Sequence, residues 1–151
     1  MPQARRRKSV RQLVAERAHH RCEYCQITSS VATSAFEIEH ITPTAHAGSD
    51  DISNMAWSCR RCNSAKGTTT TALDPQNNLP IRLFNPRLDT WLEHFAWDAS
   101  DDTRVVGKTA TGRATIAHLE LNRPELLLLR RLLKYEKLHP PPDESPNQLT
   151  Q

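Results

Sequence analysis

The chain has 151 residues, of which 37% are hydrophobic and 5% aromatic, and its formal net charge at pH 7 is +3. This length suits one domain with a core, or a small core with an extension, and the low apolar content indicates that an added staple would help the fold. No apolar segment approaches the length of a membrane span, and residues 10–18 are too polar for a signal peptide. We therefore expect a cytoplasmic protein.

The first 20 residues are expected to form a basic arm followed by a helix. Ser9 followed by Gln12 has the pattern of a capping box, and apolar residues then recur at helical spacing, which predicts a helix over residues 10–19. A basic arm suits a polyanionic partner, and on charge alone a solvated tail is an equal alternative. Five basic residues precede the first acidic one: Arg5, Arg6, Arg7, Lys8 and Arg11.

The next segment predicts a knuckle, a strand, a loop, a second strand and a helix. The first strand is expected around residues 36–41, because Pro43 cannot donate to a β-ladder and so ends it. Gly48 and its aspartate neighbours favour a turn, and a return strand is expected around Met55 and Trp57. A helix is expected to end at Gly67. Mixed helices and strand pairs of this kind predict an α+β fold.

The remainder is expected to be a small α+β extension over residues 68–138, with an irregular connector at 68–88. Residues 93–98 and 103–109 are expected to pair as a hairpin. A short helix is expected around Ile116 and Leu119, and a second one through about Leu138, capped by Asn122 and Glu125. Trp91, Phe95 and Trp97 are expected to pack a small second core, and the proline-rich residues 139–151 to form a disordered tail.

All four cysteines fall in two Cys-x-x-Cys pairs, Cys22 with Cys25 and Cys59 with Cys62. Each pair presents two thiolates, and two pairs complete the closed tetrahedral site of a structural zinc ion. Two disulfides or free buried thiols are the alternatives, and a reducing cytoplasm disfavours the disulfides. The 33 residues between the pairs exceed the spacing of a compact zinc finger, so another motif is looped out of the zinc module.

Three stretches carry a resemblance: EIEHITP at 37–43, DDISNMAW at 50–57 and CRRCNSAKG at 59–67. Together with the cysteine pairs they resemble the HNH nuclease family, named for a His, an Asn and a final His or Asn. The resemblance covers residues 21–67 and implies a ββα-metal core, in which two antiparallel strands and a helix hold one divalent ion. Zinc would then hold this small core together where hydrophobic burial is scarce.

The resemblance also implies roles for individual residues. His40 would be the general base that activates water against a phosphodiester. Glu39 and Asn63 would coordinate a catalytic magnesium or manganese ion, and Asn54 would help orient His40 through backbone contacts. Many members of the family carry Asp where this chain has Glu39, which offers the same oxygens one methylene further out.

The chemistry of these side chains fits such roles on its own. An imidazole can accept a proton from water, and carboxylate and amide oxygens suit a hard cation such as magnesium. Strict alternation along a strand puts Glu39 and His40 on opposite faces, so both reach one site only where the strand ends or bulges. A core-facing His40 is the alternative reading of that residue, and Glu37 is either a partner-orienting or a solvated carboxylate.

The expected function is therefore that of a metal-dependent HNH endonuclease acting on nucleic acid, with double-stranded DNA as the expected partner. The alternative is a zinc-stabilised nucleic-acid-binding module without catalysis. Arg60, Arg61 and Lys66 are expected to contact phosphate, with a solvated helix face as the alternative. Zinc is expected as a structural cofactor and Mg²⁺ or Mn²⁺ as the catalytic one.

Overall fold

The computed structural model describes residues 6–142. The chain begins with helix α1 (Val10–Arg17), which starts at a capping box. Ser9 Oγ accepts from the Gln12 amide at 3.2 Å, and Gln12 Oε1 accepts from the Ser9 amide at 2.8 Å. These two bonds satisfy amides that a helix start would otherwise leave unpaired, and they confirm the predicted start.

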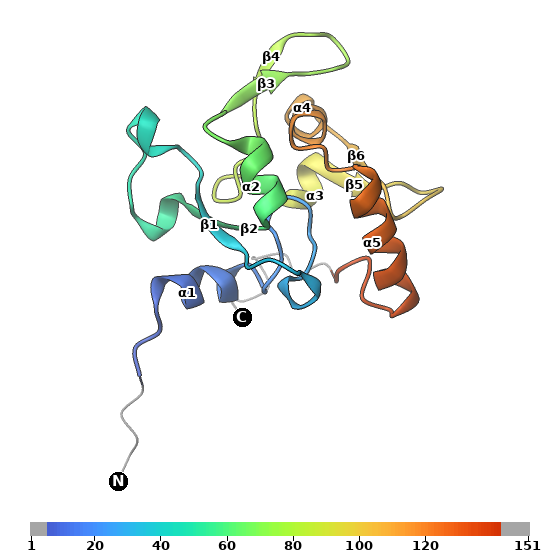
Figure 1. The fold of residues 1–151 in the computed structure, drawn as a ribbon. Helices are drawn as coiled ribbons and strands as arrows, with labels where there is room; N and C mark the ends of the chain where they lie inside the picture. The colour runs from blue at the N-terminus through green and yellow to red at the C-terminus, as the bar shows by residue number, and fades with distance from the viewer. Residues whose placement is uncertain (1–5, 143–151) are drawn as a thin grey trace, which may run out of the picture.

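Strands β1 (Glu37–His40) and β2 (Met55–Ser58) form an antiparallel pair, and helix α2 (Arg60–Lys66) follows directly. Cys59 caps the start of α2, and Gly67 ends it with a φ of 53°, a conformation that glycine adopts without strain. Figure 1 shows α1 and α2 on opposite sides of this strand pair. The predicted strand, loop, strand and helix are thus confirmed.

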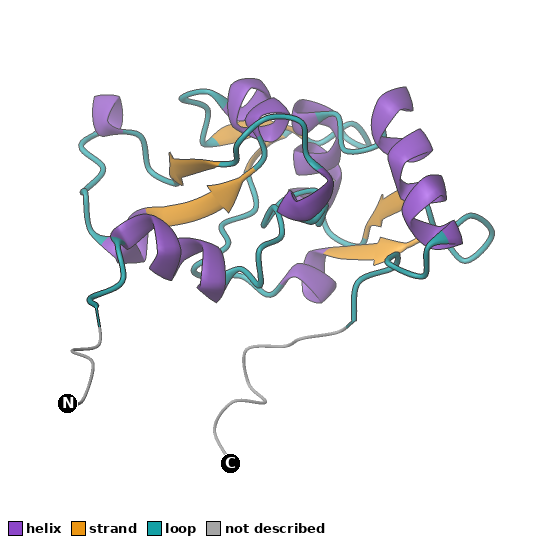
Figure 2. Ribbon diagram, turned by 60° about the horizontal axis from the view of Figure 1, so that its bottom comes forward, coloured by secondary structure: helices purple, strands orange, loops and turns teal. Residues whose placement is uncertain are grey.

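The extension contains two further strand pairs and three helices. Within residues 6–142 the strands form three separate two-stranded sheets, which Figure 2 shows as short ribbons among the helices. The expected irregular connector is wrong in part, since residues 68–88 contain a hairpin. The hairpin expected from residues 93–98 and 103–109 is confirmed. The elements are β3 (Thr71–Leu73), β4 (Pro80–Arg82), α3 (Trp91–His94), β5 (Phe95–Trp97), β6 (Val105–Gly107), α4 (Ala110–Leu119) and α5 (Pro124–Tyr135). Three single 3-10 turns lie between α1 and β2: Ser29–Val31, Thr44–His46 and Ile52–Asn54.

The cap expected for α5 is wrong. Arg123 occupies the cap position, while Asn122 instead bonds to both backbone groups of Val105, donating to its carbonyl and accepting from its amide at 2.8 Å each. An asparagine amide that satisfies two strand groups at once fastens β6 to the start of α5. The sequence pattern favoured a local cap, but a long-range partner holds this side chain.

One apolar cluster runs through both halves of the described chain. The ring of Phe84 packs edge-on against Tyr24 at 6.3 Å and against Phe95 at 5.2 Å. Trp91 Nε1 donates to the Tyr24 carbonyl at 3.0 Å. The expectation of a separate second core is therefore wrong, because the knuckle residue Tyr24 brings the two groups of rings together.

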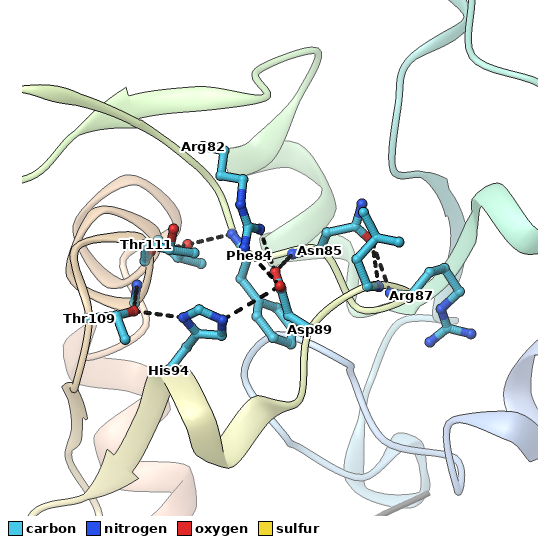
Figure 3. A network of polar contacts seen from close by, with 11 residues as sticks. Arg82, Phe84, Asn85, Arg87, Asp89, His94, Thr109 and Thr111 are labelled. Carbon is cyan, nitrogen blue, oxygen red and sulfur yellow. Dashed lines mark hydrogen bonds and ion pairs between the residues drawn. The ribbon is translucent and has the colours of Figure 1, made fainter.

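A polar network fixes the segment between β4 and α4 (Figure 3). Arg82 donates two bonds to the Asp89 carboxylate, at 2.6 and 2.8 Å. His94 lies between Asp89, 3.5 Å from its Nε2, and the Thr109 hydroxyl, 2.6 Å from its Nδ1. Burial on its own raises the pKa of Asp89, but the bonds from Arg82 and the Asn85 amide outweigh it and lower that pKa. Specific contacts within the extension thus fix this segment.

The folded part extends past the point where the tail was expected to begin. His139 is buried, its ring lies 4.5 Å from the ring of Trp97, and its Nε2 donates to the Asp102 carbonyl at 2.6 Å. The expected start of the tail at 139 is therefore wrong. Residues 143–151 of that tail, and Arg5 of the expected arm, lie outside the described residues. No helix in the described part of the chain has both the length and the apolar character to cross a bilayer.

Candidate functional site

The four cysteines meet in one cluster. Their sulfur atoms all lie within 4.8 Å of one another, and Cys25 Sγ is 3.8 Å from Cys59 Sγ. Zn–S bonds of about 2.3 Å in a tetrahedron place the sulfurs about 3.8 Å apart, so this spacing fits a single zinc ion. None of the four is in a disulfide. Burial raises the pKa of the Cys22 thiol, so a thiolate there needs a cation beside it.

The backbone of each knuckle explains this convergence. The Cys22 amide donates to the Ile27 carbonyl, and the Gln26 amide donates to the Cys22 carbonyl, both at 2.9 Å, which closes the first turn. At the second, Cys59 Sγ accepts from the Cys62 amide at 3.4 Å, in the position of a helix cap. The two turns therefore fix the cysteine side chains from both ends of the looped-out segment, and the set is positioned to hold a metal.

Two carboxylates of β1 face helix α2. Glu37 and Glu39 are two residues apart and so share one face of the strand, and both meet side chains of α2. Asn63 Nδ2 donates to Glu37 Oε2, and Lys66 Nζ lies 2.5 Å from Glu39 Oε1. The structure therefore places Asn63 beside Glu37. The carboxylate expected beside Asn63 was that of Glu39, which lies two residues further along the strand.

The Glu39–Lys66 ion pair is buried, with each side chain only 2% exposed. Tyr24 Oη donates to Glu39 Oε2 at 2.6 Å, and Lys66 Nζ donates to the Ile41 carbonyl at 3.0 Å. Burial raises the pKa of the Glu39 carboxyl above its ordinary value, while the Lys66 ammonium and the Tyr24 hydroxyl oppose that rise. Lys66 does not reach the surface, so the expectation that it contacts phosphate is wrong. Its ammonium group pairs with the Glu39 carboxylate instead.

His40 is the last residue of β1 and lies at the edge of the same region. It pairs with Met55 across the sheet, while Glu39 pairs with Ala56, so the regular register puts the two side chains on opposite faces. No bulge interrupts this register, and the strand ends at His40. His40 is 31% exposed, and its Nε2 lies 2.8 Å from Asp50 Oδ1.

Asn54 ties the loop between the strands to the chain just after His40. Its Oδ1 accepts from the Thr42 amide at 2.9 Å, and its Nδ2 donates to the carbonyls of Thr42 and Ser49 at 3.0 and 2.8 Å. A side chain at Gly48 would place its Cβ only 1.7 Å from the Thr42 carbonyl oxygen. The loop therefore closes tightly over residues that follow His40, and a glycine is required at that approach.

The two arginines expected to contact phosphate lie on the exposed start of α2. Arg60 and Arg61 are both exposed, and Arg61 donates to Glu120 Oε2 at 2.5 Å. Sequence reasoning did not single out Tyr24 or Asp50 as contacts of Glu39 and His40. No spacing rule would have found them, since a knuckle residue and a loop residue reach these side chains only through the fold.

Lys66→Met is expected to destabilise the protein strongly. It leaves the Glu39 carboxylate buried without its cation, and breaking a buried pair from one side costs about 3–5 kcal/mol. Urea unfolding, followed by circular dichroism, should show a large fall in the midpoint. Adding Glu39→Gln in the same chain should restore much of the loss, because no unpaired charge then remains buried.

Lys134→Met is the matched control for this change. Lys134 also lies near a helix end, 2.7 Å from a carboxylate oxygen of Asp102, but its side chain is 55% exposed. The loss should therefore stay below about 1 kcal/mol. Equal effects of the two substitutions would contradict the distinction drawn between the buried and the exposed pair.

Comparison with known proteins agrees with this geometry. Residues 22–69 match the model of the HNH endonuclease family. This segment is an HNH domain. The matched residues contain the cysteine cluster, β1, β2 and α2, and the loop that Asn54 closes. The HNH family consists of nucleases that act on nucleic acid, so the domain implies a nuclease-type function.

A similar curated protein is the Septu protein PtuB of Bacillus thuringiensis, which is 26% identical over 126 residues. The alignment covers 82% of this chain but 45% of that relative, so the chain spans less than half of the relative's length. No solved structure matches the chain. The likeness to this relative extends beyond the HNH domain into the extension, because 126 aligned residues exceed the domain's own length.

Proposed function

We propose that this protein is a metal-dependent endonuclease that hydrolyses phosphodiester bonds in nucleic acid, with double-stranded DNA as its substrate. One observation carries the proposal: the segment that matches the HNH family also folds as two strands and a helix, with a half-buried histidine at the strand end. On the same strand, Glu37 contacts Asn63 of α2, and Glu39 lies two residues further on. Phosphodiester hydrolysis needs a base for water and a cation for the phosphate, and the domain has groups for both.

His40 is the proposed general base. Asp50 holds Nε2, and a carboxylate favours the tautomer in which that nitrogen carries the proton. Nδ1 is then the nitrogen that accepts a proton from the attacking water. Asn54 supports this arrangement by fixing the backbone of Thr42, two residues beyond His40. Solvent reaches the imidazole, as a water-activating group requires.

Glu39 and Asn63 are the proposed ligands of the catalytic ion, and Glu37 is proposed as a further one. Together they offer only carboxylate and amide oxygens, the donor set that suits Mg²⁺ or Mn²⁺, so the residues present fit such an ion. When bound, the ion would stabilise the charge on the phosphate and on the departing oxygen. Glu37 and Asn63 are half-buried and in contact. Glu39 would have to bind the ion with a carboxylate that is also paired with Lys66.

The buried Glu39–Lys66 pair gives the alternative function its support. A lysine that neutralises a proposed metal ligand favours a domain that binds nucleic acid without cutting it. The exposed Arg60 and Arg61 and the basic residues before α1 would serve such binding equally well. The two functions therefore differ in whether the ion binds at β1 and α2.

Nicking of supercoiled plasmid by the purified protein separates them. We expect conversion to the open-circular form with Mg²⁺ or Mn²⁺, and no conversion without added divalent ion, while the zinc content stays unchanged. Salt-dependent DNA binding without cleavage under either ion would contradict the endonuclease and leave the binding module. An RNA substrate of the same length, assayed in parallel, tests the proposed preference for DNA.

A further inference from the structure

Arg130 of α5 is fully buried, and its side chain is the largest of those that solvent does not reach. Its guanidinium donates to the carbonyls of Thr103 and Leu121 at 3.0 and 2.9 Å, and to that of Cys25 at 3.3 Å. It also lies 5.1 Å from the ring centre of Trp97. Within residues 6–142, no carboxylate forms an ion pair with it. A buried guanidinium with only neutral partners requires negative charge nearby.

Arg123, the cap residue of α5, is a second arginine with little solvent exposure. Its side chain is 8% exposed, and its two terminal nitrogens lie 3.9 Å from Cys62 Sγ and 4.0 Å from Cys59 Sγ. Glu125 lies 3.7 Å from Arg123 Nε, but this carboxylate is 67% exposed and therefore well screened by water. The cysteine sulfurs are the buried neighbours of Arg123 that carry negative charge when they bind a metal as thiolates.

The charges of the two arginines and of a zinc-loaded cluster balance. Four thiolates around one divalent zinc ion leave two negative charges in excess, and the two guanidiniums supply two positive ones. Four protonated thiols, or two disulfides, would be neutral and would leave Arg130 without a charged partner and Arg123 with only the exposed Glu125 carboxylate. The arginines therefore fit the metal-bound state of the cluster. Arg130 contacts the backbone of the cluster, since it donates to the carbonyl of Cys25.

We propose that Arg123 and Arg130 are the counter-charges of a zinc–tetrathiolate cluster, and that α5 of the extension thereby determines how firmly the HNH domain holds its zinc. This inference does not depend on whether the domain cuts nucleic acid. Zinc binding at neutral pH releases the thiol protons and creates a dianionic cluster, so a nearby positive charge favours the bound state. Losing that charge removes a favourable electrostatic contact with the metal-bound cluster and makes the ion easier to remove.

A cavity borders the cluster on the side of Cys59, the only one of the four cysteines that is not fully buried. Cys25 and Cys59 line a cavity of about 620 Å³, whose wall includes Arg123 and the apolar side chains of Leu126 and Leu129 from α5. The proposed counter-charge of Arg123 thus lies in the wall of the cavity that borders the cysteines.

The test compares Arg123→Gln, Arg123→Lys and Arg131→Gln in the full chain. Arg131 lies on α5 as well but is exposed, so it is the matched control. Zinc affinity is measured by competition with a chelator of known affinity, and release by the rate of transfer to a chromogenic chelator. We expect Arg123→Gln to weaken zinc binding about 10–100-fold, as loss of an outer-shell partner does. Arg123→Lys should stay near wild type, and Arg131→Gln should equal it.

Two results would overturn the proposal. One is wild-type zinc affinity in a folded Arg123→Gln protein, which would show that the charge does not act on the cluster. The other is an equal loss of zinc in Arg123→Lys, which would assign the effect to the shape of the guanidinium and not to its charge. If Arg123→Gln does not fold, the lysine variant decides alone: retained zinc supports the proposal, and lost zinc overturns it.

Discussion

His40→Ala is expected to reduce metal-dependent plasmid nicking by about 10²–10⁴-fold, the usual contribution of a general base. The imidazole is half-buried at the end of β1 and bonds to one exposed loop carboxylate, so little of the fold depends on it. Zinc content, thermal unfolding and DNA binding should therefore remain close to wild type. The measurement is the initial rate of nicking at saturating Mg²⁺ or Mn²⁺, with the circular dichroism melt of the same samples.

His46→Ala is the matched control. His46 lies in the loop that follows β1, in the turn Thr44–His46, and is exposed. The same substitution there should leave the rate within a factor of about two, since the proposed base is untouched. A His40→Ala protein that nicks at the wild-type rate would remove His40 from the mechanism. Equal losses in both variants would point to the loop as a whole rather than to one imidazole.

Cys59→Ser is expected to abolish zinc binding and to unfold the HNH domain. The side chain is both a member of the sulfur cluster and the cap of α2, where it accepts from the Cys62 amide. Serine is a good cap, so this substitution keeps the helix start and removes only the metal ligand. Structural zinc sites contribute about 10–16 kcal/mol at neutral pH, which exceeds the whole stability of most domains of this size.

The measurement is zinc stoichiometry together with thermal unfolding. We expect less than one zinc ion per chain and no cooperative transition, while wild type stripped with a chelator should behave in the same way. Ser64→Ala, at an exposed position of the same helix, should change neither quantity. A Cys59→Ser protein that retains a full zinc ion and melts like wild type would show that the cluster does not support the fold.

The sequence by itself determined the elements whose cause is local. A capping box, a proline after an alternating segment and a glycine at a helix end each act within a few residues of their own position, so α1, β1, β2 and α2 were predicted correctly. The paired cysteine spacing likewise predicted one shared cluster, because each turn of four residues fixes its two thiols without help from the rest of the chain. The HNH motifs lie in these same locally determined elements.

Only the tertiary structure decided which side chains meet. Glu37 and Glu39 are equivalent by alternation, and the position of α2 alone gives Asn63 to one and Lys66 to the other. Arg130 reaches the carbonyl of Cys25 across 105 positions of sequence. Neither set of contacts produces a periodic pattern in the sequence. A buried charge is satisfied by whichever groups the packed elements bring within bonding distance.

The extension was predicted less well for the same physical reason. The β3–β4 hairpin lies in a turn-rich stretch, and the expected second core joined the first because Tyr24 packs against Phe84. Strand pairing and ring packing gain their free energy from partners distant in sequence, so local composition constrains them weakly. The sequence thus specified the elements of the HNH domain, while long-range packing placed Arg123 and Arg130 of the extension against the cysteines of that domain.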